Sequence, residues 1–146
     1  MDKLTWKKIN ADELVSYKQS PDSTYSSKLL LGTEFAGTPV ININEGILEP
    51  FSRTAGAAHK ELEIYAILDV GDDCDVVLDD EHIPVRNGDI ITIPGGVFHW
   101  IDNTRCDKPF KLWTLWDRQE LNGMFFKREK EWGTSMRFVK DEPTAE

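Results

Sequence analysis

The stretch that decides the fold is Gly88–Asn103, GDIITIPGGVFHWIDN. The alternating apolar run that ends at Ile93 predicts a strand, because successive side chains of a strand point to opposite faces. Residues 94–96, PGG, predict a tight turn in which glycine can take a positive φ. A second strand over Val97–Ile101 then carries His99 on one face. The stretch therefore predicts a strand, a turn and a strand that together direct an imidazole into a barrel.

The same stretch holds five residue types at fixed spacings. In order they are a glycine, five residues, a proline, one residue, a glycine, two residues, a histidine, three residues and an asparagine, filled by Gly88, Pro94, Gly96, His99 and Asn103. This pattern resembles the second motif of the cupin superfamily. The resemblance implies an all-β fold, a double-stranded β-helix or jelly-roll cupin barrel with short flanking helices, and it makes His99 a metal ligand.

Upstream, the segment Ala57–Leu68, AAHKELEIYAIL, resembles the first cupin motif with one change. His59 and Glu63 stand where the family has its second histidine and its glutamate. Ala57 stands where the first histidine would be, and Phe51 replaces the glycine expected before it. The second motif is therefore intact, whereas the first lacks one ligand.

Alternation along this segment suggests which side chains share a face. One face carries Ala57, His59, Glu61, Glu63 and Tyr65. If that face lies inside the barrel, an imidazole and two carboxylates are buried, which is costly unless a cation or hydrogen-bond partners neutralise them. The same alternation also fits an ordinary strand whose charged face is wet and whose apolar residues, Leu62, Ile64 and Ala66, point inward.

A divalent transition metal would neutralise the buried groups. His59, Glu63 and His99 form a set of two histidines and one carboxylate, which binds iron in open sites and zinc or manganese in other geometries. Histidine and carboxylate do not choose among iron, zinc, manganese and nickel. The missing ligand at Ala57 would leave a position for water, oxygen or substrate. Glu61 and Tyr65, on the same face, are the candidate catalytic residues for proton transfer.

The remaining pattern is that of one domain with short connections. Further strands are predicted over Val40–Leu48, Cys74–Leu78, Ile83–Arg86 and Lys111–Trp116. We expect residues 36–117 to form the barrel core. Residues 1–35 would form an N-terminal extension with a first strand and a short helix over Trp6–Tyr17, where Asn10 is a candidate cap. Residues 118–146 would form a C-terminal segment with a short helix and a disordered tail.

The composition argues against some classes of binding partner. A net charge of −9 over 146 residues argues against nucleic-acid binding, because a phosphate backbone requires a basic surface. No stretch of about twenty apolar residues is present, so we expect no membrane span. The N-terminus lacks the apolar core of a signal peptide, which predicts a cytoplasmic location. The resemblance to small cupins implies a homodimer.

Three tryptophans fall in the barrel half of the chain, Trp100, Trp113 and Trp116. They could line an aromatic pocket or form core and dimer surface, and packing is the commoner use of such side chains.

Function follows from the site, because the fold that the resemblance implies hosts many chemistries. The sequence favours a metal-dependent enzyme acting on a small polar organic molecule inside the barrel, by Lewis-acid or oxygen-activating chemistry of the dioxygenase, isomerase or lyase type. The alternative is a ligand-binding or regulatory cupin without catalysis, in which Ala57 marks a degenerate metal site.

Overall fold

The computed structural model describes residues 8–31, 41–116 and 137–138. Almost all of its regular structure is strand. The elements are a 3₁₀ turn η1 (Ala11–Glu13) and the strands β1 (Tyr17–Lys18), β2 (Tyr25–Leu31), β3 (Asn42–Leu48), β4 (Ser52–Arg53), β5 (Glu63–Asp69), β6 (Asp75–Leu78), β7 (Glu81–Pro84), β8 (Ile90–Ile93), β9 (His99–Asn103), β10 (Phe110–Trp116) and β11 (Arg137–Phe138). The all-β prediction is confirmed.

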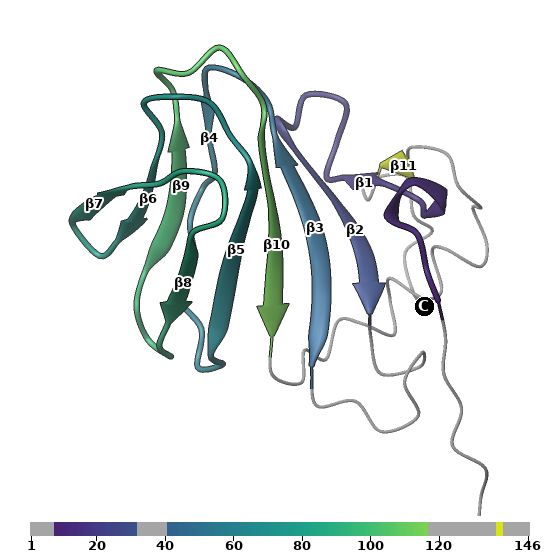
Figure 1. Cartoon of the computed structure of the whole chain (residues 1–146), viewed down its shortest axis with the longest axis horizontal. Helices are drawn as coiled ribbons and strands as arrows, with labels where there is room; N and C mark the ends of the chain where they lie inside the picture. The colour runs from purple at the N-terminus through teal and green to yellow at the C-terminus, as the bar shows by residue number, and fades with distance from the viewer. Residues whose placement is uncertain (1–7, 32–40, 117–136, 139–146) are drawn as a thin grey trace, which may run out of the picture.

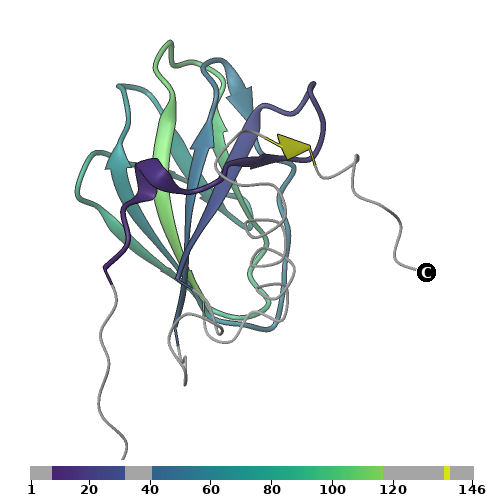
Figure 2. The same cartoon turned by 90° about the vertical axis from the view of Figure 1, so that its right-hand side faces the viewer.

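The strands form two sheets (Figure 1). The larger sheet has the order β11-β1-β2-β3-β10-β5-β8, and the smaller has the order β4-β9-β6-β7. In the side view the strands form two curved layers (Figure 2). Among the described residues no strand pairs with both sheets, so the predicted jelly-roll barrel consists of two sheets that are not closed on each other.

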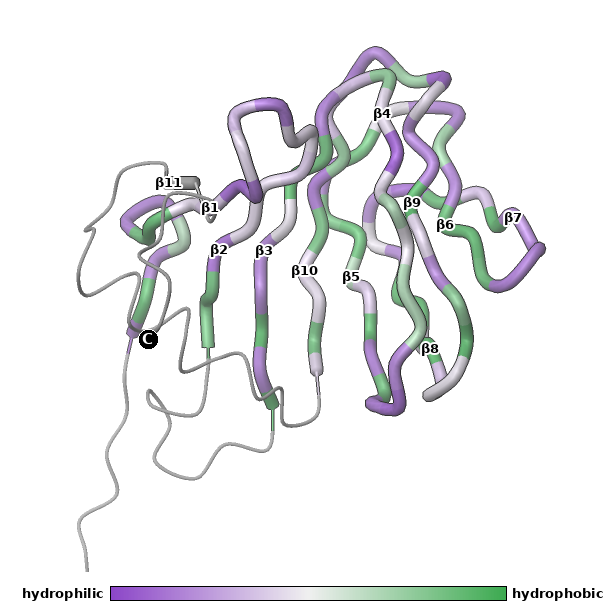
Figure 3. The backbone as a smooth tube through the Cα atoms, turned by 180° about the vertical axis from the view of Figure 1, so that it is seen from behind, coloured by the Kyte–Doolittle hydropathy of each residue, from purple (hydrophilic) through white to green (hydrophobic). Residues whose placement is uncertain are grey.

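A shared core joins the layers. The buried side chains Leu48, Ile67, Phe110 and Leu112 of the larger sheet pack in one cluster with Val76 and Ile101 of the smaller sheet. Along β10 the burial alternates, with Phe110, Leu112 and Thr114 buried and the residues between them partly exposed. The alternation of apolar and polar residues that this requires is visible along the strands in Figure 3.

The helix predicted over Trp6–Tyr17 is reduced, among the described residues, to the 3₁₀ turn η1. At the N-terminal end, Asn10 caps a helix as predicted, its side chain accepting a hydrogen bond from the Asp12 N–H. The helix nevertheless ends at Glu13. Residues Val15 and Tyr17 are both buried with a less buried residue between them, so the chain becomes extended where the helix was expected to continue. The C-terminal helix predicted within 118–146 lies outside the described residues.

The hairpin of β6 and β7 is tighter than the sequence suggested. Leu78 pairs with Glu81, which leaves only Asp79 and Asp80 in the turn. Asp79 has φ 51°, the left-handed conformation that two-residue hairpin turns require. The strand predicted over Ile83–Arg86 therefore begins two residues earlier. In the part of the chain described here, no helix has the length and apolar character needed to cross a bilayer.

Candidate metal centre

His99 is the first residue of β9 and is 5% exposed. Its Nδ1 lies 2.9 Å from the carbonyl oxygen of Val97. A carbonyl can only accept, so Nδ1 carries a proton and donates it. The Nε2 atom then faces the interior, 2.9 Å from Oε2 of Glu63.

The turn before β9 also holds the segment that carries His59. The Gly96 N–H donates to the His59 carbonyl at 2.8 Å, and Gly96 has φ 89°. Gly95 packs so closely on Lys60 that a Cβ there would collide with the Lys60 carbonyl oxygen. The two motifs, more than thirty residues apart in sequence, are therefore connected through this turn.

His59 lies on irregular chain, and its side chain is 19% exposed. Its Nδ1 donates to the carbonyl oxygen of Glu61 at 3.0 Å, and its Nε2 lies 3.0 Å from Oε2 of Glu63. On one side its ring lies against Trp116, with 4.3 Å between the ring centres. The orientation of His59 thus depends on neighbours from two other segments.

Glu63 is the first residue of β5 and is 2% exposed. Both histidines direct Nε2 at the same carboxylate oxygen, and both already have a proton on Nδ1. Neutral rings would present lone pairs to an anion, so the arrangement requires a cation between them, either a proton or a metal. One ligand atom from each residue lies within 4.8 Å of the others. The donor set and its spacing therefore fit a divalent transition metal.

The pKa of His99 is also consistent with a cation at this site. Burial would lower it, but the hydrogen bond to Glu63, the Val97 carbonyl and the charge of Glu63 together raise it above its ordinary value. A positive charge at this point is thus stabilised by the surrounding chain.

The side-chain pattern around β5 decides between the two faces that the sequence left open. Glu63 and Tyr65 are 2% and 6% exposed, whereas Leu62 is 48% exposed. The face bearing the carboxylate is therefore interior, and the wet-face interpretation is wrong. Glu61 does not follow Glu63 inward, because the regular strand begins only at Glu63 and strict alternation does not extend back to position 61.

The site opens into a cavity of about 860 Å³. Its described lining is Tyr17, Lys18, Gln19, Asp22, Ser23, Thr24, Tyr25, Ser27, Asn44, Arg53, Thr54, Ala55, Gly56, Ala57, His59, Glu63, Tyr65, His99, Ile101, Thr114 and Trp116. Of the two predicted catalytic residues, Tyr65 is in this lining and Glu61 is not. A volume of this size suits a small organic ligand.

Sequence reasoning missed the cavity wall formed by β2, which includes Tyr25. The only sequence feature that could have indicated this wall was Gly46 on the neighbouring strand. A Cβ at Gly46 of β3 would overlap the phenol of Tyr25, so the glycine makes room for the ring. Burial, followed by the charge of Glu63, raises the pKa of Tyr25, and the same two causes raise that of Tyr65. Both phenols therefore keep their protons at neutral pH.

Comparison with solved structures finds similar folds. One is a Cupin 2 conserved barrel domain protein from Salinispora arenicola CNS-205, 16% identical over 87% of this chain and 99% of that one, with a TM-score of 0.58. Another is a predicted oxalate decarboxylase from Thermotoga maritima, 20% identical over 77% and 100%, with a TM-score of 0.65. A third is the polyketide cyclase RemF from Streptomyces resistomycificus, 17% identical over 79% and 81%, with a TM-score of 0.67.

This chain has the cupin fold. The resemblance noted in its two motifs is thus confirmed, and the structural likeness carries the fold alone at these identities. No family model matches the chain, and no curated protein matches it by sequence.

The departure from the cupin pattern at Ala57 can now be placed. Ala57 forms an isolated bridge with His99, each donating its backbone N–H to the other's carbonyl, at 3.1 and 3.0 Å. It also lines the cavity. Position 57 is therefore beside the candidate ligands, and its methyl group leaves space there.

A second group of possible ligands lies on the smaller sheet, formed by Asp75, His82 and Asp102. Arg105 already donates to the Asp75 carboxylate at 3.0 Å. His82 lies 3.4 Å from the same carboxylate oxygen, and its side chain is 49% exposed. This group thus has Arg105 as its cation, whereas no lysine or arginine of the described ranges is paired with Glu63.

Proposed function

We propose that this protein is a metal-dependent enzyme that acts on a small polar organic molecule in the cavity beside His59, Glu63 and His99. The observation that carries the proposal is the convergence of both Nε2 atoms, at 3.0 and 2.9 Å, on one oxygen of a carboxylate that is 2% exposed. Both Nδ1 atoms donate to backbone carbonyls, an arrangement typical of histidines that bind metals through the other nitrogen.

A metal held there would supply Lewis-acid polarisation or, if it were iron, a site for oxygen. The proposal leaves open iron, zinc, manganese and nickel. Solved structures of similar fold named as a predicted oxalate decarboxylase and a polyketide cyclase support a catalytic role, and these different names leave the reaction type open.

The chain's own residues would bind and orient the substrate. Tyr65 lies edge-on to His99, with 5.9 Å between ring centres, and its raised pKa keeps the hydroxyl protonated, so that it could donate a hydrogen bond to a substrate oxygen. Trp116 forms a wall against His59. Glu61, first considered for proton transfer, supports the site differently in this proposal, because its carbonyl fixes the tautomer of His59.

The second candidate is a ligand-binding cupin without catalysis. Ala57 favours it, because three protein ligands bind a metal less tightly than four. In that case the cavity would bind its ligand equally well with and without metal.

The test measures the thermal midpoint of metal-stripped protein after addition of Mn²⁺, Fe²⁺, Ni²⁺ or Zn²⁺. A metal that binds only the folded chain raises stability by about 2.7 kcal/mol at one hundred times its Kd. Glu63→Gln should lose this shift. Glu45→Gln is the matched control, because Glu45 is 4% exposed in the same sheet but accepts from Trp113. No shift in the wild type, or an equal shift in Glu63→Gln, would refute the proposal.

The homodimer and the cytoplasmic location remain predictions from the sequence. Light scattering over a range of concentrations tests the homodimer.

A further inference from the structure

The charges around the cavity limit what it can bind. Lys18 and Arg53 are the only lysine and arginine among the described lining residues. Whether either faces a ligand decides whether the cavity can neutralise an anion, because a carboxylate removed from water without a partner is strongly destabilised.

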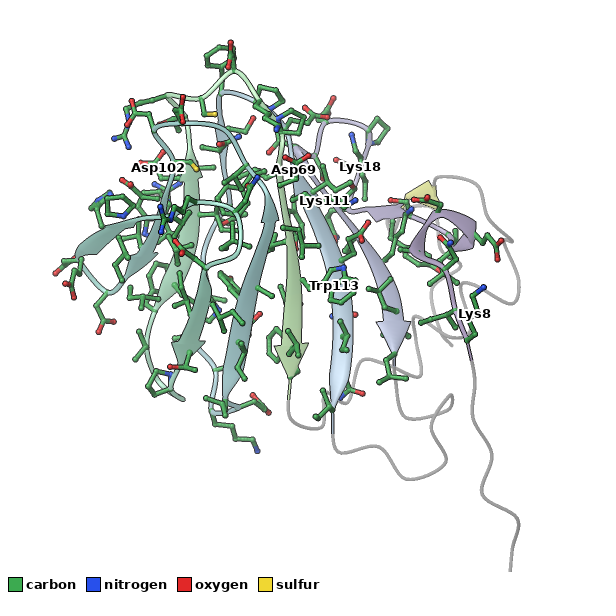
Figure 4. The ribbon with its side chains drawn as sticks, viewed as in Figure 1. Lys8, Lys18, Asp69, Asp102, Lys111 and Trp113 are labelled. Atoms are coloured by element: carbon green, nitrogen blue, oxygen red, sulfur yellow. The ribbon has the colours of Figure 1, made fainter. Side chains whose placement is uncertain are left out.

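Lys18 is already paired. Its Nζ donates to Oε1 of Glu49 at 3.0 Å, and its side chain is 19% exposed. It belongs to β1 of the larger sheet (Figure 4), whereas His99 belongs to the smaller sheet. Its charge is therefore compensated within the chain.

Arg53 borders the cavity, but its charged end is elsewhere. The guanidinium carbon lies 3.8 Å from the centre of the Trp100 ring. Trp100 is absent from the cavity lining, although its neighbours His99 and Ile101 on β9 are both present in it. Adjacent residues of a strand face opposite ways, so the guanidinium lies over the outer face of the smaller sheet.

The other described lining residues add no lysine or arginine. Besides the candidate ligands and Asp22, the side chains are hydroxyls, amides, aromatic rings and small apolar groups. Two of these side chains are the phenols of Tyr25 and Tyr65. Glu63 and Asp22 add negative charge, which disfavours an anionic ligand further.

We propose that the cavity binds an uncharged ring compound bearing hydroxyl groups and discriminates against carboxylates and phosphates. This rests on the proposed function for the location of the ligand, and it names the substrate class. Tyrosine hydroxyls, Thr54 and Thr114 match the hydroxyl groups of such a ligand, and Trp116 presents an aromatic wall to its ring. The positive charge within the ligand group, whether a proton or a metal, lies against the Glu63 carboxylate, which compensates it in part.

The experiment compares two probes of similar size that differ in charge. Resorcinol and 3-hydroxybenzoate are titrated by calorimetry into metal-stripped and metal-loaded protein at pH 8. We expect resorcinol to bind at least tenfold more tightly in both forms. Equal or tighter binding of 3-hydroxybenzoate in either form would overturn the inference, as would the absence of binding by both probes.

Three variants test whether the charges of the cavity lining determine the preference for resorcinol. Lys18→Met and Arg53→Gln should leave the preference unchanged, because neither charge faces the ligand. Ser27→Arg, which places a cation in the lining, should bring the two affinities to within about threefold of each other. Loss of the preference in Lys18→Met or Arg53→Gln would contradict the account.

The test of the ligand class can fail or succeed independently of the test of metal binding. If added metals fail to stabilise the stripped protein while it still prefers resorcinol, the metal enzyme is refuted and the ligand class stands. If metals bind and 3-hydroxybenzoate is preferred, the reverse holds.

Discussion

The two histidines of the site are held in different ways. His99 begins a regular strand, is 5% exposed and is fixed by a carbonyl two residues away. His59 has the same kind of local anchor, because its Nδ1 donates to the Glu61 carbonyl, but it lies on irregular chain, is more exposed, and also contacts the turn at Gly95 and Gly96 and the ring of Trp116. The two imidazoles are therefore fixed alike at Nδ1, whereas the backbone of the altered motif lacks a regular strand at its histidine and is supported by contacts from elsewhere.

This contrast shows where the site can change. The ligand missing from the cupin pattern, at position 57, belongs to the segment held from outside. A metal ligand on a regular strand is positioned by the backbone hydrogen bonds of the sheet, so substitutions near it lower the stability of the fold. A metal ligand on irregular chain is positioned by contacts with other segments, so substitutions near it lower the metal affinity first.

The largest predicted difference is in the free energy of unfolding of variants at the two histidines. His99→Ala and His59→Ala should both abolish metal binding, but His99→Ala should also destabilise the metal-stripped protein by about 2 kcal/mol, because it removes a buried side chain and its hydrogen bond. His59→Ala should cost under about 1 kcal/mol. Urea unfolding measures both, and equal losses would remove the distinction.

The turn offers the next test. Gly95→Ala should push the Lys60 carbonyl away and lower metal affinity by about 10- to 100-fold through His59. Gly88→Ala is the control, because Gly88 has φ 92° but nothing lies within 4 Å of a Cβ there. It should lose about 1 kcal/mol of stability and keep its metal affinity. Calorimetric titration with Zn²⁺ distinguishes them, and equal affinity in Gly95→Ala and the wild type would contradict the connection.

A smaller effect is expected from the ring beside His59. Trp116→Leu should weaken metal binding by about threefold to tenfold, because the imidazole loses one wall. Trp113→Leu, on the outer side of the same strand, should leave the affinity unchanged even though it removes the hydrogen bond to Glu45. If both variants weaken binding equally, the effect belongs to the strand and not to the contact.

The smallest effect concerns the opposite face of β9. Burial would raise the pKa of Asp102, but hydrogen bonds from the Thr104 hydroxyl and N–H, helped by Arg105 and His82, lower it overall. The ionised carboxylate therefore stabilises the fold above the unfolded pKa of about 3.9, and this is lost as pH falls through the lower folded value. Thr104→Val should unfold at a slightly higher pH during acid titration followed by circular dichroism. An unchanged acid midpoint would show that the hydroxyl contributes nothing there.

The parts of the fold and the site that depend on local sequence could be predicted. The turn over residues 94–96 and the strand bearing His99 follow from glycine, proline and alternation. Alternation also put Glu63 and Tyr65 on one face, but only the burial of both side chains in the structure shows that this face is interior. Glu61 could not be placed, because the regular strand begins only at Glu63 and the sequence pattern does not mark that boundary. The wall containing Tyr25 depends on pairing between β2 and β3, which no local pattern reports.

The most direct test of the central claim is elemental analysis of protein purified without a metal-affinity resin, comparing wild type with the His59→Ala, His99→Ala double variant. The account predicts close to one transition-metal ion per chain in the wild type and none in the double variant. A wild type that carries no metal and takes up none on incubation, or a double variant that retains its full content, would contradict it.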